Sequence, residues 1–388
     1  MSKIRVLHIL DELNTGGAEQ VVFSYLQNID KKKYQWDFII MNIPGKPEGR
    51  LEEKVRKLGC NVYKVTKKRD NLIKNIIEVD KIISLGHYDI VHSHLYEVSA
   101  FYLLSAKIHK VPVRIAHNHS SNQTRGIKVD LLRHILKPIL KYVANSYVAC
   151  GIDAATSLWG NRLYESGKVK IIYNAIDTTK FQYKDDVRRQ IKSKLKIDGC
   201  KVIGTVGRFS IEKNSAFNIE IFKEIHKRDS RTRLVIVGEG ELKNEIEYKI
   251  KEYSLENSVM LLGRRNDVYD LLNCFDVFLL PSLSEGLPIV LVEAQCNGLP
   301  CVVSDSVTKE VAFSNNVRYL SLKSSAIEWA DNVIEMFNYR EIDSKIAKDR
   351  VISNGYDIVD AANELDNFYT ELLLSLIHIS EPTRPEPI

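Results

Sequence analysis

Two carboxylates, Glu285 and Glu293, stand eight residues apart in the most informative part of the chain, residues 275–304. The apolar run at 275–280 is typical of a buried strand, and Pro288 is typical of the first position of a helix. Strand, loop and helix in this order are typical of parallel α/β sheets, which bind ligands at the carboxyl ends of their strands. Because a bound phosphate would repel an acid, we expect both carboxylates to accept hydrogen bonds from ligand hydroxyls. The alternative is two solvent-facing glutamates.

Two cations, Arg208 and Lys213, follow another strand pattern at 202–209, just before a predicted helix at 215–228. Arginine binds phosphate through its planar fork and lysine through a compact charge. At a strand end these side chains could clamp a diphosphate and stabilise a departing nucleoside diphosphate without a metal. The alternative is two surface cations that bind nothing.

A glycine loop, Gly16-Gly17, lies between the apolar run 4–10 and a helical pattern that starts near residue 18. Two adjacent glycines let the backbone approach a ligand closely. The loop lacks the G-x-G-x-x-G spacing of a dinucleotide fingerprint. It is therefore either a simple turn or part of a different ligand site.

Four histidines lie at the ends of two further strand patterns: His92 and His94 after one, and His117 and His119 after the other. Histidines in such positions could indicate a metal. We expect none, because no carboxylate or cysteine accompanies them in a ligand spacing.

Taken together, these motifs resemble the retaining glycosyltransferases of the GT-B architecture, the glycosyl transferases group 1 family. The resemblance rests on E-G-L-P-x-x-x-x-E from Glu285 to Glu293, G-R-x4-K-N around Arg208 and Lys213, and the N-terminal G-G loop. It covers nearly all of residues 1–374. One departure is Ala175 in the N-A-I-D turn, where the family has glycine.

The resemblance implies an α/β fold of two facing Rossmann-like domains with a central cleft. We expect an acceptor-side domain at 1–177 and a nucleotide-sugar domain at 178–356, which opens with a polar linker at 178–199. A helix at 357–374 would cross back to the first domain. The last stretch, 375–388, contains three prolines and is expected to be a non-native tail.

The implied reaction is retaining transfer of a hexose-type sugar from a nucleotide diphosphate donor, with a UDP-sugar favoured. The acceptor would be a hydroxyl of a saccharide or lipid-linked saccharide, in bacterial exopolysaccharide or lipopolysaccharide biosynthesis. No cofactor or metal is implied. The implied donor-binding residues are Gly16, Gly17, Arg208, Lys213, Val268, Glu285, Gly286, Leu287, Pro288 and Glu293.

The resemblance also implies individual roles. Arg208, Lys213 and the helix start at 286–288 would hold the diphosphate, and backbone near Val268 would hold the base. Glu293 would accept from ribose hydroxyls and Glu285 from sugar hydroxyls. His117 would steady the sugar near the reacting carbon, with His119 as the competing candidate. His117, Arg208, Lys213 and Glu285 form the expected catalytic set.

Three other functions share some of these features. A nucleotide-sugar 2-epimerase of the same architecture would bind the donor without an acceptor. A sugar phosphorylase normally needs a pyridoxal lysine, for which no motif is present. A non-catalytic nucleotide-sugar-binding subunit would not need the four charged residues Arg208, Lys213, Glu285 and Glu293, which are all present.

Charge and composition indicate the partners and the compartment. Residues 1–185 hold 29 lysines and arginines against 18 acids, a net +11, and residues 186–388 hold 26 against 32, a net −6. A basic first half suggests an anionic partner, which could be a membrane surface, a lipid-linked phosphate or an acidic sugar. The alternative is an uneven distribution of solubilising charge, and nucleic acid is disfavoured because no recognition motif is present. Six scattered cysteines, no signal peptide and no long apolar run predict a cytoplasmic protein, at most peripheral to the inner face of the plasma membrane.

Overall fold

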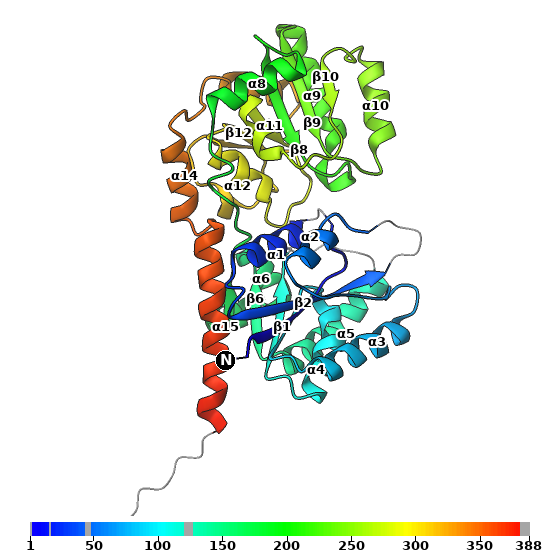
Figure 1. Ribbon diagram of the computed structural model, residues 1–388. Helices are drawn as coiled ribbons and strands as arrows, with labels where there is room; N and C mark the ends of the chain where they lie inside the picture. The colour runs from blue at the N-terminus through cyan, green and yellow to red at the C-terminus, as the bar shows by residue number, and fades with distance from the viewer. Residues whose placement is uncertain (1, 15–16, 43–47, 120–126, 381–388) are drawn as a thin grey trace, which may run out of the picture. The chain divides into compact units, whose positions relative to one another are not determined.

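Two parallel sheets organise the chain, one in each of two units (Figure 1). The computed structural model describes residues 2–14, 17–42, 48–119 and 127–380, with the backbone alone for 127–131 and 376–380. Unit 1 comprises Met1–Asn174 and Ile358–Ile388, and unit 2 comprises Ala175–Asp357. In the described residues, no helix is long and apolar enough to cross a membrane.

The sheet of unit 1 has the order β3-β2-β1-β4-β5-β6-β7, and every neighbouring pair is parallel. Its strands are short, mostly apolar runs that are buried, as expected for a parallel sheet with helices on both faces. Successive strands are added on one side of β1 up to β3 and on its other side from β4 onward, so the topological switch point lies between β1 and β4. The strands are β1 Ile4–Ile9, β2 Tyr34–Asn42, β3 Val62–Thr66, β4 Ile90–Ser93, β5 Val113–Asn118, β6 Ser146–Ala149 and β7 Val169–Ile171.

The helices of unit 1 cover this sheet. They are α1 Gly17–Asn28, α2 Glu52–Lys57, α3 Leu72–Gly86, η1 Tyr96–Val98, α4 Ser99–Ile108, α5 Ile127–Val143, α6 Ile152–Trp159, α7 Asn161–Glu165 and α15 Ile358–Ser380. Right-handed crossovers place α3, α4 and α5 on one face. The long C-terminal helix α15 packs against α1, and its Asp366 accepts hydrogen bonds from Lys33 and from the Tyr34 hydroxyl.

Unit 2 repeats the arrangement with the sheet order β10-β9-β8-β11-β12-β13, again parallel throughout. The strands are β8 Lys201–Val206, β9 Thr232–Val237, β10 Val259–Leu261, β11 Val277–Leu280, β12 Cys301–Ser304 and β13 Val317–Leu320. The helices are α8 Asp185–Leu195, η2 Ile211–Lys213, α9 Ser215–Arg228, α10 Lys243–Glu252, α11 Val268–Cys274, α12 Ile289–Cys296, η3 Lys309–Val311, α13 Ala326–Met336 and α14 Ser344–Ser353.

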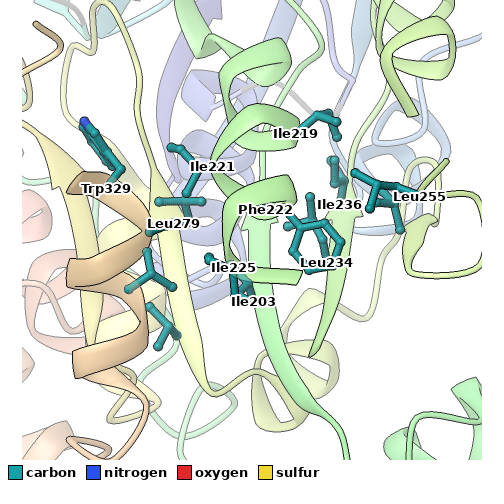
Figure 2. Packing of buried hydrophobic residues seen from close by; sticks show 14 of the residues in the cluster. Ile203, Ile219, Ile221, Phe222, Ile225, Leu234, Ile236, Leu255, Leu279 and Trp329 are labelled. Atoms are coloured by element: carbon teal, nitrogen blue, oxygen red, sulfur yellow. The ribbon is translucent and has the colours of Figure 1, made fainter. Parts of the chain in front are cut away.

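The core of unit 2 lies between its sheet and α9 with α13. The buried cluster in Figure 2 includes Phe222 of α9, Trp329 of α13 and the strand residue Leu279. All three side chains are fully buried. This rigid layer supports the loops that leave the carboxyl ends of β8 and β11.

The predicted class, parallel α/β with two Rossmann-like units, is confirmed. Several elements differ from the sequence prediction. The expected linker at 178–199 contains α8, whose charged surface buries no side chain and so lacks the apolar period of a core helix. Helices α4 and α10 and strand β13 were not predicted. Helix α12 begins at Ile289, with Pro288 as its N-cap residue.

The expected end of the last helix at residue 374 was wrong, since α15 continues through Ser380. The residues from Ser375 to Ser380 contain neither proline nor glycine, and the first proline of the segment is Pro382. Nothing local therefore stops the helix at 374. Residues 381–388 lie outside the described part of the chain.

Candidate active site

In unit 2, the predicted acid and cation loops meet at the point where the sheet changes its winding direction. Strands β8 and β11 are neighbours, although β9 follows β8 in the chain. The loop after β8 carries Arg208 and Lys213, and the loop after β11 carries Glu285. Carboxyl ends of neighbouring strands that lead to opposite sides of a sheet leave a crevice between their loops, where α/β proteins bind ligands.

Lys213 and Glu285 form an ion pair across these two loops. The Lys213 Nζ donates to both carboxylate oxygens of Glu285, at 2.6 and 2.8 Å. The Ser282 hydroxyl donates to Glu285 Oε1 at 2.6 Å, and the Leu283 N–H donates to the Glu212 carbonyl at 2.7 Å. The side chain of Lys213 is 23% exposed and that of Glu285 is 7% exposed. The pair is therefore largely desolvated, and it holds the ammonium in one place.

Arg208 lies at the same strand end but is not part of this pair. Its side chain is 70% exposed, and its Nη2 lies 3.0 Å from Glu241 Oε2. The next loop packs closely here, because a Cβ on Gly238 would lie 1.8 Å from the Gly207 carbonyl oxygen. Gly238 also has a φ of +148°, so this contact requires glycine. Glu241 was not predicted to contact Arg208. The only feature of the sequence that could have indicated this contact is its position directly after the G-E-G turn.

The start of α12 presents unused donors beside Glu285. The N–H groups of Gly286, Leu287 and Ile289 donate to no group in the described structure. Unpaired N–H groups and the positive end of the helix dipole together favour an anion at this place. Among the described residues of unit 2, these N–H groups, the Lys213 ammonium and the Arg208 guanidinium are groups that could bind a diphosphate.

Glu293 lies within α12, one turn or more beyond these donors. The residue is partly buried. Its backbone carbonyl accepts from the Asn297 N–H at 3.1 Å, but its carboxylate has no hydrogen bond or ion pair with a described residue. Burial raises the pKa of its carboxyl to about 7. A desolvated carboxylate without a protein partner can accept hydrogen bonds from ligand hydroxyls. Val268, which was predicted to bind the base of the nucleotide sugar, is the first residue of α11. No hydrogen bond or ion pair in the described structure links it to the Lys213–Glu285 pair.

In unit 1, Gly17 is the first residue of α1, and Gly16 lies outside the described residues. All four predicted histidines converge, and His8 of β1 joins them. The centroids of neighbouring histidine rings in this cluster lie 3.9–5.4 Å apart. The signal for His8 was its place in a neighbouring strand, because its Cα is the register partner of His92.

One chain of hydrogen bonds runs through three of these rings. His119 Nδ1 lies 3.2 Å from Asn174 Oδ1, His94 Nδ1 lies 2.8 Å from His119 Nε2, and His8 Nδ1 lies 3.1 Å from His94 Nε2. Each neutral ring carries one N–H, and Asn174 Oδ1 can only accept. Each Nδ1–H therefore donates toward Asn174, which leaves His8 Nε2 unprotonated, buried and without a partner in the described structure.

A second chain links the C-terminal helix to the same cluster. The Tyr369 hydroxyl of α15 lies 2.7 Å from His92 Nδ1, and His92 Nε2 lies 3.2 Å from His117 Nδ1. His117 Nε2 is buried and has no partner among the described residues. Tyr369 was not predicted, since a tyrosine at residue 369 carries no local signal of a contact with β4.

Burial keeps these imidazoles neutral near pH 7. It lowers the pKa of His8 to about 3 and that of His119 to about 4, and it places the pKa values of His92, His94 and His117 well below 6.5. Two triads, His8–His92–His94 and His94–His117–His119, each bring one ring nitrogen per residue within 4.8 Å of the others. The expectation of no metal stays a prediction.

His117 and His119 differ in access. His117 is the second-last residue of β5 and has a buried side chain, whereas His119 follows the strand and is partly exposed. His119 is therefore the ring that a ligand reaches first. Its two nitrogens already have partners, so a ligand hydroxyl would meet it beside Asn174 or His94.

Two family models match the chain, one for each half. Residues 15–180 match the model described as Glycosyltransferase Family 4, and residues 186–355 match the model described as Glycosyl transferases group 1.

Full-length relatives agree with these matches. The chain is 33% identical over 375 residues to the putative glycosyltransferase EpsF of Bacillus subtilis, covering 95% of this chain and 97% of EpsF. It is 26% identical over 390 residues to an Escherichia coli enzyme named UDP-Gal:alpha-D-GlcNAc-diphosphoundecaprenol alpha-1,3-galactosyltransferase, covering 96% and 98% of the two chains. Among solved structures, Anabaena Alr3699/HepE in complex with UDP-glucose matches with a TM-score of 0.78 at 16% identity, over 95% of this chain and 100% of the other. This last likeness concerns the fold.

Proposed function

This chain belongs to the glycosyl transferases group 1 family, and we propose that it transfers a hexose-type sugar from a UDP-sugar to a hydroxyl of a lipid-linked saccharide, with retention of the anomeric configuration. The donor and acceptor classes are supported by the name of the E. coli relative, which gives UDP-Gal as donor and a diphosphoundecaprenol-linked sugar as acceptor. The product would enter a bacterial surface polysaccharide, and the reaction would take place on the cytoplasmic side of the plasma membrane.

The observation that carries this proposal is the Lys213–Glu285 pair beside the open start of α12. As the bond between the anomeric carbon and the diphosphate breaks, negative charge develops on the leaving phosphate oxygen. The Lys213 ammonium, which Glu285 holds in place, and the N–H groups of Gly286 and Leu287 would be fixed donors for that charge, and the exposed Arg208 guanidinium would add a further donor. Donors held in place before the reaction lower its barrier without reorganisation.

Retention without a covalent enzyme intermediate needs a base on the face of the leaving group. We assign that role to a phosphate oxygen of the departing diphosphate, which takes the proton of the acceptor hydroxyl as the new glycosidic bond forms. The buried Glu285 is already engaged by Lys213 and Ser282, so it suits positioning of sugar hydroxyls better than nucleophilic attack. No metal takes part in this scheme.

The remaining site residues would position the donor. Glu293 would accept from ribose hydroxyls, since no described residue bonds to its carboxylate. Backbone at Val268 would hold the base. For unit 1, contacts of its glycine loop with the diphosphate and of a histidine with the sugar stay predictions. Between His117 and His119, the partly exposed His119 is favoured.

The test is a panel of UDP-, GDP- and ADP-sugars, scored by thermal shift and by release of nucleoside diphosphate, each with and without EDTA. A ligand that binds the folded chain raises the melting temperature by mass action. We expect one nucleotide class to stabilise the protein and to be hydrolysed slowly in the absence of acceptor, whether or not EDTA is present. Isomerised donor without release would replace the proposal with a 2-epimerase. A folded protein that responds to no nucleotide would overturn the donor site.

A further inference from the structure

Half of the exposed large hydrophobic side chains in the described structure lie on three neighbouring helices of unit 1. Twenty such side chains are exposed in all, and ten of them belong to α3, α4 and α5. They are Leu72, Ile73, Ile77 and Leu85 on α3, Leu104 and Ile108 on α4, and Leu132, Ile135, Ile139 and Tyr142 on α5. Scattered exposed leucines are ordinary, whereas a gathering of this kind marks an interaction surface.

The three helices form one continuous surface. Helix α4 packs against α3 on one side and α5 on the other (Figure 1). The Lys107 ammonium of α4 lies 3.3 Å from the centroid of the Tyr142 ring of α5 and donates to the Tyr142 carbonyl. Tyr142 is nevertheless 74% exposed, and Ile73 of α3 is 73% exposed. We call the ten side chains the α3–α5 surface.

Lysines are interspersed with this apolar surface. Lys74 and Lys81 of α3 are exposed, as is Lys110 just beyond α4, and Lys107 is partly exposed. Against these four cations, the described parts of the three helices contribute two acids, Glu78 and Asp80, which are partly buried. The Asp80 carboxylate is also engaged, since the Ser105 hydroxyl and His109 Nε2 lie within 3.0 Å of it. The exposed charge of the surface is therefore positive.

This composition distinguishes between kinds of partner. The buried centres of protein–protein interfaces are depleted in lysine. Surfaces that lie in a membrane interface combine aliphatic side chains, which enter the acyl boundary, with lysines that reach the headgroups. Anionic lipids attract such lysines, and each one near the surface strengthens binding several-fold. The excess of basic residues in the first half of the chain adds to this attraction.

We propose that the α3–α5 surface docks the protein on an anionic lipid bilayer, with Ile73, Ile77, Ile135 and Ile139 in the interface and Lys74, Lys81 and Lys110 on the headgroups. The inference rests on the proposed function in one respect: a lipid-linked acceptor lies in a bilayer, so the enzyme must reach one. The contact itself requires neither donor nor acceptor.

The experiment is flotation of the full chain with vesicles, without any nucleotide sugar. Vesicles of 30% phosphatidylglycerol and 70% phosphatidylethanolamine are compared with vesicles of phosphatidylcholine alone, at 0.1 and 0.5 M KCl. We expect binding to the anionic vesicles, at least tenfold weaker binding to the neutral ones, and a clear loss at high salt. Equal binding to both kinds of vesicle would overturn the role of the lysines.

Three double variants separate the parts of the surface. I73S/I77S and I135S/I139S, and separately K74E/K81E, should each weaken binding to anionic vesicles at least tenfold. The matched controls on unit 2 are I327S/I342S, at positions 53% and 73% exposed, and K251E/K345E, at exposed lysines. The controls should bind like the unsubstituted chain. If they lose as much binding as the surface variants, the proposal is wrong.

Two further measurements keep the result independent of the donor site. The melting temperature without nucleotide should be nearly unchanged in all surface variants, which shows that they are folded. Sedimentation velocity tests the rival occupant, a second copy of the chain. A dimer that I135S/I139S dissociates, together with no vesicle binding, would overturn the membrane assignment in favour of self-association.

Discussion

The ammonium of Lys213 lies 2.6 and 2.8 Å from the two carboxylate oxygens of Glu285, although 72 residues separate the two in the sequence. The pair joins the loop after β8 to the loop after β11. It places a positive charge next to the N–H groups of Gly286 and Leu287, which have no acceptor among the described residues, and Glu285 balances that charge while no anion is bound. The roles of Lys213 and Glu285 can therefore be tested by separate substitutions.

Replacing Lys213 by alanine should lower kcat/KM for donor turnover by roughly 100-fold or more. The lysine is expected to stabilise charge on the leaving diphosphate, and removal of one such fixed donor typically costs about this factor. Turnover of the donor found in the nucleotide panel is the measurement. Lys249→Ala is the matched control, because Lys249 pairs with Glu220 elsewhere in unit 2. Full activity in Lys213→Ala would exclude the assigned role.

Replacing Glu285 by glutamine should have opposite effects on turnover and on product binding. Sugar transfer should fall, because a neutral amide orients Lys213 and the sugar hydroxyls poorly. Affinity for UDP should rise roughly fivefold, since about 1 kcal/mol of repulsion between a nearby carboxylate and the diphosphate is removed. Titration calorimetry measures the second effect, with Glu220→Gln as the control. Weaker UDP binding by Glu285→Gln would contradict this account of the pair.

Donor affinity should rise with pH between about 6 and 8. Burial raises the pKa of Glu293 to about 7, so the carboxylate that is proposed to accept ribose hydroxyls is formed only as the pH passes that value. The histidine cluster does not titrate in this window, because burial holds its pKa values far lower. The measurement is the Kd of the intact UDP-sugar, whose phosphates carry no proton to lose near neutral pH. Glu293→Gln should remove the dependence.

The same pKa has a consequence for stability. A carboxyl whose pKa is higher in the folded than in the unfolded chain stabilises the fold below the unfolded value of 4.5, and that stabilisation is lost as pH rises through about 7. Urea unfolding should therefore find Glu293→Gln more stable than the unsubstituted chain at pH 8, by at most about 3 kcal/mol. The two proteins should be similar at pH 5. Equal stabilities at both pH values would mean that Glu293 is not desolvated.

Alanine at His119 and at His117 should act on different properties. His119 is partly exposed, and its loss should lower kcat by roughly 10- to 100-fold with a modest change in stability. His117 is buried against His92, so His117→Ala should cost about 1–3 kcal/mol of unfolding free energy by leaving His92 Nε2 without its partner. Turnover and urea unfolding are measured on both, with His134→Ala as an exposed control. Normal kcat in His119→Ala would return the assignment to His117.

Removing divalent ions should leave turnover within about twofold of its starting rate. In the proposed mechanism, Arg208, Lys213 and the start of α12 would supply the positive charge that a metal would otherwise bring to a diphosphate. Overnight dialysis against EDTA, followed by elemental analysis and a turnover assay, tests this. The two histidine triads are the groups in the described structure that could retain an ion. Activity lost with EDTA and restored by Mg²⁺ or Mn²⁺ would contradict metal independence.

Local patterns in the sequence were enough to predict most of the parallel α/β elements and the loops that carry the site. Short apolar runs such as the one ending at Leu280 specify buried strands, and the turn residues after them specify where loops begin. The placement of Arg208, Lys213 and Glu285 at strand ends followed from these signals alone. Helix α8 was missed because it has no apolar period, which is the pattern used to predict helices. Its contacts are made by charged side chains, such as Arg188, which pairs with Asp276.

Only the tertiary structure decided which of these residues meet. Glu285 pairs with Lys213 because β11 lies next to β8, and that neighbour relation is set by crossovers between distant segments. His8 joins His92 because β4 lies next to β1, and Tyr369 reaches His92 from the C-terminal helix. No local preference encodes such contacts. They depend on the burial of whole helix faces and sheet faces, which is a property of the folded chain.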